Sequence, residues 1–109
     1  MEPLAAITAL SALAQPTRLA TFRLLVQHEP DGLPAGEVAL AVGAPANTMS
    51  AHLAVLSRSG LVTAERRSRS IIYRADLEQL RTLVLFLLKD CCEGRAEICA
   101  PLLADLAPC

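Results

Sequence analysis

Residues 35–60 read AGEVALAVGAPANTMSAHLAVLSRSG, and this stretch decides the fold. It predicts a helix over residues 35–42, because Gly43 can adopt the left-handed conformation that often ends a helix. A second helix is expected over residues 45–60, where apolar residues recur at helical spacing. Two short helices with a brief connection form a helix-turn-helix pattern, which we place at residues 35–59. The buried stripe of the second helix is expected to be Met49, Leu53 and Leu56.

The residues that follow predict a hairpin with a basic tip. Segments 61–65 and 71–75 have strand character, and the arginine-rich stretch 66–70 lies between them. We therefore assign residues 61–75 to a wing. The chain has 109 residues, of which 53% are apolar, so one domain over residues 1–109 is expected. The predicted fold class is mostly α with a small β-hairpin wing, a dimeric winged helix-turn-helix.

Three further helices are expected outside this central region. They cover residues 3–14, 16–28 and 76–92, with Asp76 as N-cap of the last one. The last helix carries a heptad-like seam that suits a partner helix, so residues 1–15 and 76–92 are expected to hold a homodimer together. The seam consists of Leu77, Leu80, Val84, Leu87 and Cys91. The buried face of the second helix is expected to be Leu19, Phe22, Leu25 and Val26.

Charge is unevenly distributed along the chain. The formal net charge is −1, yet residues 58–74 hold five arginines against Glu65 alone. A local basic patch on a neutral body can bind phosphate with limited non-specific affinity. The N-terminus lacks a signal-peptide pattern, and the longest apolar run, residues 83–88, is too short to span a bilayer. We therefore expect a cytoplasmic protein with no membrane partner and with reduced cysteines.

Three local motifs resemble the ArsR/SmtB family of winged-helix repressors. The sequence AQPTRL at residues 14–19 is similar to the family's L-x-D-P-T-R-L, and NTMSAHL at 47–53 is similar to S-T-V-S-x-H-L. The sequence LSRSGLV at 56–62, followed by residues 66–73, is similar to L-x-x-A-G-L-V and the wing. The resemblance covers roughly residues 4–92 and implies a repressor that binds double-stranded operator DNA. The chain departs from the family at residues 37–41, which lack the E-L-C-V-C-D type of cysteine motif.

The candidate DNA-binding residues lie on the second helix of the motif and at the hairpin tip. Asn47, Ser50 and Ala51 can read base edges, and Thr48 suits a phosphate. For His52, a contact with DNA and a packed, hydrogen-bonded position within the protein are about equally expected. The alternative for the helix is a merely polar surface, and for the hairpin tip a solvated turn. The tip residues expected to meet the DNA backbone or minor groove are Arg66, Arg67 and Arg69.

Residues 91–99 read CCEGRAEIC, within a cysteine-bearing segment at residues 91–109. Three soft thiolates without a neighbouring histidine suit a trigonal thiophilic ion, and As(III) or Sb(III) is the expected inducer. The proposed ligands are Cys91, Cys92 and Cys99. Cys91 also continues the apolar seam, so a small buried hydrophobe is the alternative there. Cys109 is expected to be a free thiol, with a fourth ligand as the minority interpretation.

The sequence thus predicts a metalloid-responsive transcriptional repressor that leaves its operator when the ion binds. One alternative is a winged-helix sensor of redox state or persulfide that uses the same cysteines in reversible disulfides. A second is a zinc- or cadmium-responsive repressor with Cys109 as fourth ligand. A cysteine-dependent enzyme is disfavoured, because no histidine base neighbours the thiols and no glycine-rich phosphate loop is present.

Overall fold

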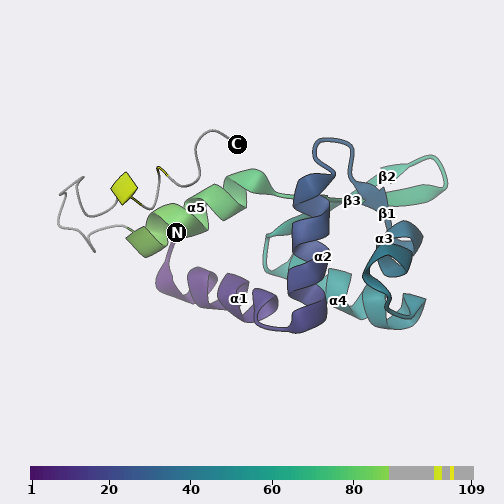
Figure 1. Cartoon of the computed structure of the whole chain (residues 1–109), viewed down its shortest axis with the longest axis horizontal. Coiled ribbons are helices and arrows are strands. Elements are labelled where there is room, and N and C mark those ends of the chain that lie inside the picture. Colours follow the sequence, from purple (N-terminus) through teal and green to yellow (C-terminus); the bar gives the residue numbers. More distant parts are fainter. Residues whose placement is uncertain (89–99, 102–103, 105–109) are drawn as a thin grey trace.

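The computed structural model describes residues 1–88, 100, 101 and 104 (Figure 1). Its architecture confirms the predicted fold class, since the described part is mostly helical with a small antiparallel hairpin. In chain order the elements are α1 (Pro3–Leu13), α2 (Pro16–Gln27), β1 (Leu33–Pro34), α3 (Ala35–Val42), α4 (Ala46–Arg58), β2 (Val62–Arg67), β3 (Ser70–Ala75) and α5 (Leu77–Leu88).

Helices α2, α3 and α4 pack around the centre of the core. The predicted stripe of α4 is confirmed, because Met49, Leu53 and Leu56 are fully buried. Gly43 ends α3 with a φ of 82°, as the sequence predicts, and Pro45 precedes α4 without giving it a side-chain cap. The core residues that close around this stripe from other elements are Leu25, Val38, Leu61 and Val62.

The sheet has the strand order β1-β3-β2, and both pairings are antiparallel. The hairpin strands are longer than the sequence analysis expected, because Arg66 and Arg67 belong to β2 and Ser70 belongs to β3. Only Ser68 and Arg69 remain in the turn. Backbone pairing therefore runs to the tip, with Arg67 opposite Ser70, and it holds the basic side chains on a regular ladder.

Strand β1 was not predicted from the sequence. It pairs Leu33 with Tyr73 and Pro34 with Ile72. The approach depends on Gly32, which has a φ of 74° and would place a Cβ only 2.5 Å from the Tyr73 carbonyl oxygen. Any side chain at this position would push β1 away from β3. The turn before β1 thus joins the helical core to the wing.

Helices α1 and α5 lie together at one end of the molecule, and the β2–β3 hairpin lies at the other (Figure 1). Helix α1 buries small residues and exposes large ones. Its core face is Ala6, Ala9 and Ala12, whereas its outer face is Leu4, Ile7 and Leu10, with exposed fractions of 68%, 60% and 40%. Helix α5 likewise buries Leu83 while exposing Leu77, Val84 and Leu87.

The expected buried face of α2 is partly wrong. Leu19 is 45% exposed, and Thr21 is buried in addition to Phe22 and Leu25. The Thr21 hydroxyl lies 3.6 Å from the Met49 sulfur, so α2 turns this face toward α4. A buried threonine with a weak partner is not visible in apolar spacing, which explains the error.

Asp76 is confirmed as N-cap of α5, because the Gln79 backbone N–H donates to its carboxylate at 3.1 Å. Over the described residues, no single helix is both long and apolar enough to cross a membrane. The pair α3 and α4 passes that test only in combination, and it is bent by 108°.

Candidate nucleic-acid interface

The exposed face of α4 carries four of the predicted DNA-binding residues. Asn47, Thr48, Ser50 and Ala51 are all exposed, on the side of the helix away from its buried stripe. The first two turns of such a helix are the part that enters a major groove in helix-turn-helix proteins. An amide, two hydroxyls and a methyl are thereby presented by a helix whose opposite face is fixed in the core. The arrangement can read base edges by hydrogen bonds and apolar contact.

His52 lies at the border of this face and is half-buried. Its Nδ1 is 3.4 Å from Nη1 of Arg18, which comes from the first turn of α2. The Nε of Arg18 donates to the Ala12 carbonyl oxygen of α1 at 2.6 Å. One side of the imidazole is therefore engaged within the protein. Sequence analysis did not identify Arg18 as a partner, because 34 positions separate it from His52.

The predicted arginines of the wing are all exposed. Arg66 and Arg67 extend from β2, and Arg69 lies in the turn. Arg67 pairs with Glu65 at 3.2 Å, but both side chains are about half exposed. Exposed pairs of this kind contribute little to stability, so a phosphate can replace the carboxylate at small cost.

Arg74 has a different role from the arginines at the tip. Its Nε and Nη2 donate to the two carboxylate oxygens of Glu29 at 3.1 and 2.9 Å. The exposed fractions of the two side chains are 35% and 15%. From the sequence, Arg74 was only one of the five arginines of residues 58–74, and Glu29 was not singled out. The two-point pair shows that Arg74 joins β3 to the turn after α2.

The hydrogen bonds that Arg74 donates to Glu29 and the negative charge of that carboxylate both raise the pKa of Arg74 above its ordinary value. Below its ordinary pKa Arg74 stays charged, so titration of the arginine removes the pair's contribution to stability only as the pH rises through the raised pKa. Arginine titration consequently plays no part in the physiological range.

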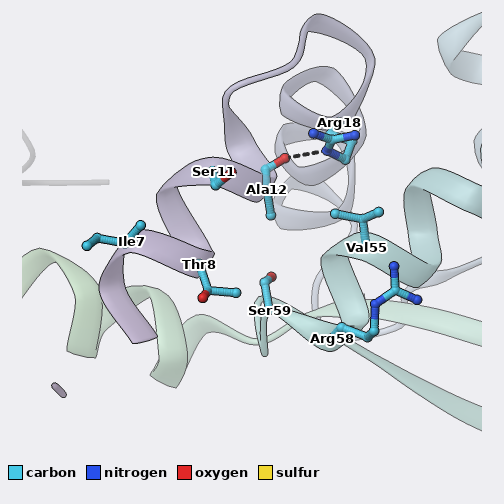
Figure 2. A pocket seen from close by; sticks show the side chains of 8 residues that line it. All are labelled: Ile7, Thr8, Ser11, Ala12, Arg18, Val55, Arg58 and Ser59. Atoms are coloured by element: carbon cyan, nitrogen blue, oxygen red, sulfur yellow. Dashed lines mark hydrogen bonds between the residues drawn. The ribbon is translucent and has the colours of Figure 1, made fainter. Parts of the chain in front are cut away.

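A hollow of about 290 Å³ lies between α1, α2 and α4 (Figure 2). Arg18 and Arg58 line it, together with Thr8, Ser11 and Ser59, and no carboxylate is among its lining residues. Figure 2 shows the hydrogen bond from Arg18 to Ala12 at its edge. The Ser59 hydroxyl is already used, since it donates to the Leu56 carbonyl oxygen at 2.7 Å.

The predicted ion ligands Cys91, Cys92 and Cys99, and also Cys109, lie outside the described residues. Within residues 1–88, 100, 101 and 104, no group of three histidine, cysteine, aspartate or glutamate side chains could hold a metal ion. The ion site predicted from the sequence therefore stays a prediction.

Comparison with known proteins gives one domain family and several solved structures. A family described as a helix-turn-helix domain matches residues 13–65. The chain is 30% identical to a homodimeric winged helix-turn-helix DNA-binding domain from Mycobacterium bovis, described as a possible ArsR-family transcriptional regulator. That match covers 84% of each chain, with a TM-score of 0.63. None of the curated proteins matches the chain significantly.

Two further solved structures resemble the chain over most of its length. One is a possible transcriptional regulator for arsenical resistance, 31% identical, covering 89% of this chain and 94% of that one, with a TM-score of 0.60. The other is an ArsR-like transcriptional regulator from a Rhodococcus species. It is 24% identical, covers 94% of this chain and 90% of that one, and has a TM-score of 0.73. At that identity it supports the fold alone.

Proposed function

We propose that this chain, which belongs to the ArsR family of winged helix-turn-helix transcriptional regulators, is a metalloid-responsive repressor. In this proposal the reduced, ion-free homodimer binds double-stranded operator DNA. Binding of As(III) or Sb(III) to Cys91, Cys92 and Cys99 then releases it. The protein acts in the cytoplasm and is a regulator rather than an enzyme.

The observation that carries DNA binding is the pairing of two surfaces. The exposed polar face of α4 can enter a major groove, and the exposed arginines of the wing can meet the flanking backbone. Contacts with bases determine which DNA sequence is bound, and contacts with phosphates position the protein on the duplex. The face of α4 can supply the first kind of contact and the wing the second. The rest of the chain is acidic or neutral, so the attraction to DNA is confined to these two surfaces.

The homodimer is supported by the outer faces of α1 and α5. Helices α1 and α5 contact each other at the end of the molecule far from the wing (Figure 1), and both leave large apolar side chains exposed: Leu4, Ile7 and Leu10 on α1, and Leu77, Val84 and Leu87 on α5. Exposed apolar side chains on two adjoining helices favour burial against a partner. A two-fold axis through these faces would present two copies of α4 to a palindromic site, with half-sites about 10 bp apart. The similar domain from M. bovis is itself homodimeric.

The switch is supported by the donor set alone. Three thiols within nine residues match the preference of trivalent arsenic for three soft ligands. Arsenous acid, As(OH)₃, would exchange three As–O bonds for three As–S bonds, and the three thiol protons would leave as water with the hydroxides. No oxidant is consumed. Cys91 follows the last described residue of α5 by three positions, so an ion bound there acts next to the helix that carries the seam.

The test uses reduced full-length protein and a duplex that the wild type selects from a randomised DNA pool. Titration with arsenite should weaken binding to this duplex, and a typical allosteric coupling corresponds to roughly 5- to 150-fold. Serine at Cys91, Cys92 or Cys99 should leave DNA affinity unchanged and remove the response. Cys109→Ser is the matched control and should respond like the wild type.

The same titration separates the alternatives. Release by Zn²⁺ or Cd²⁺ that requires Cys109 would replace the three-thiol site with a four-thiol site. Release by an oxidant or a persulfide donor, without response to arsenite, would identify a thiol redox sensor.

A further inference from the structure

Arg18 joins three helices through one guanidinium group. It lies in the first turn of α2, its Nε donates to the Ala12 carbonyl oxygen in α1, and its Nη1 contacts the Nδ1 of His52 in α4. The backbone N–H of Arg18 is itself held by the side chain of Gln15 at 2.8 Å. Hydrogen bonds therefore hold both the backbone of Arg18 and one side of its guanidinium, and the other side contacts the imidazole.

The contact with His52 fixes which imidazole nitrogen carries the proton. A guanidinium has only donors, so the Nδ1 of His52 must be the acceptor. A neutral imidazole that accepts at Nδ1 carries its hydrogen on Nε2. The second nitrogen of His52 is thereby a hydrogen-bond donor.

The place of His52 on α4 indicates what this donor meets. His52 lies one helical turn after Thr48, at the border of the exposed face that also holds Ser50 and Ala51. Among the described residues, no protein acceptor is recorded for Nε2. A phosphate oxygen beside the groove is the acceptor that DNA would supply at the edge of a recognition helix.

We propose that Arg18 is a positioning residue for DNA recognition, holding His52 in the tautomer whose Nε2–H donates to a backbone phosphate. The proposal deepens the proposed function and rests on it for the identity of the DNA. Because Arg18 also holds the last turn of α1, a shift of α1 at the proposed dimer face would move the same guanidinium. In this way Arg18 transmits a shift of α1 at the dimer face to the His52 side chain at the DNA.

The first test needs no DNA. Long-range ¹H–¹⁵N spectra of the full chain in alkaline buffer report which nitrogen of His52 is protonated. The wild type should show the Nε2–H form alone, and Arg18→Met should show a mixture of the two neutral forms, because a free neutral imidazole populates both with Nε2–H in excess. Arg58→Met is the matched control, because Arg58 lines the same hollow and has no recorded contact with His52 (Figure 2). An Nδ1–H form in the wild type, or an unchanged spectrum in Arg18→Met, would overturn the proposal.

The second test separates the two nitrogens of His52 by substitution. His52→Gln can place its amide nitrogen near the position of Nε2, whereas the shorter amide of His52→Asn lies near the position of Nδ1 and leaves no donor near that of Nε2. With the selected duplex, His52→Asn should bind roughly three- to tenfold more weakly, the value of one hydrogen bond. His52→Gln should stay within about twofold of the wild type. The reverse order, or no loss in either variant, would overturn the proposal.

The third test combines the substitutions. Arg18→Met should weaken DNA binding in the wild-type background but hardly at all in the His52→Gln background, because glutamine has no tautomer to fix. Equal losses in both backgrounds would assign Arg18 a general structural role and overturn the proposal. Failure of arsenite to release DNA would instead remove the proposed switch, while the spectra and this cycle would stand.

Discussion

Helices α1 and α4 are similar in length, with 11 and 13 residues, yet they are built in opposite ways. Helix α4 places its large residues, such as Met49 and Leu53, in the core and small polar ones outside. Helix α1 places alanines in the core and leaves Leu4 and Ile7 outside. Both patterns satisfy helical spacing in the sequence. The difference supports the proposed dimer, in which a second chain would bury the large outward residues of α1.

The largest expected effect comes from the inner face of α4. Leu53→Ala removes a fully buried side chain, and the free energy of unfolding should fall by about 2–5 kcal/mol. Urea denaturation followed by circular dichroism measures this. Leu4→Ala, on the outer face of α1, is the control and should change the stability by less than about 0.5 kcal/mol when the protein is dilute enough to be monomeric. A loss at Leu4 equal to that at Leu53 would contradict the comparison.

A charged substitution tests whether the outer face of α1 forms the dimer interface. Ile7→Glu would bury a carboxylate beside its own copy in a two-fold interface, and an unpaired buried charge costs about 3–5 kcal/mol. The dimer dissociation constant should therefore rise more than about 100-fold in sedimentation experiments. Leu40→Glu is matched to it, because Leu40 is 85% exposed but lies on α3, and it should leave the dimer intact. A wild-type monomer at micromolar concentration would refute the dimer itself.

Substitutions on the outer face of α4 should change DNA binding and leave the stability of the protein unchanged. Asn47→Ala should cost about 1–3 kcal/mol at one base pair and relax the preference there. Binding to single-base variants of the selected duplex measures both quantities. Because Asn47 is exposed, the melting temperature should not change. Unchanged affinity and preference would show that α4 does not read bases at this position.

Substitutions in the wing should change the salt dependence of DNA binding rather than its base preference. Arg67→Ala and Arg69→Ala should each weaken binding to all duplexes alike and lower the slope of log K against log salt by about 1. Arg23→Ala, an exposed arginine on α2, serves as the charge-matched control and should leave the slope unchanged. If either tip arginine altered base preference, the wing would be reading bases instead of phosphates.

Sequence reasoning succeeded where periodicity and local chemistry determine structure. The stripe of α4, the glycine that ends α3 and the capping Asp76 could all be predicted from neighbouring residues. It failed where a contact joins distant positions. The contact of Arg18 with His52 spans 34 positions and that of Arg74 with Glu29 spans 45, and no local pattern encodes either. Strand β1 escaped notice because two residues are too short to show alternation.

The small sheet has two edges, and each discourages the addition of another strand. On one side β1 ends at Pro34, which has no backbone N–H to offer a neighbour. On the other side β2 presents Glu65, Arg66 and Arg67, all exposed and charged. Charged edges resist the edge-to-edge pairing that leads to aggregation. The wing arginines that are proposed to face DNA should therefore also keep crowded copies of the protein apart, and a wing neutralised to weaken DNA binding should be less soluble.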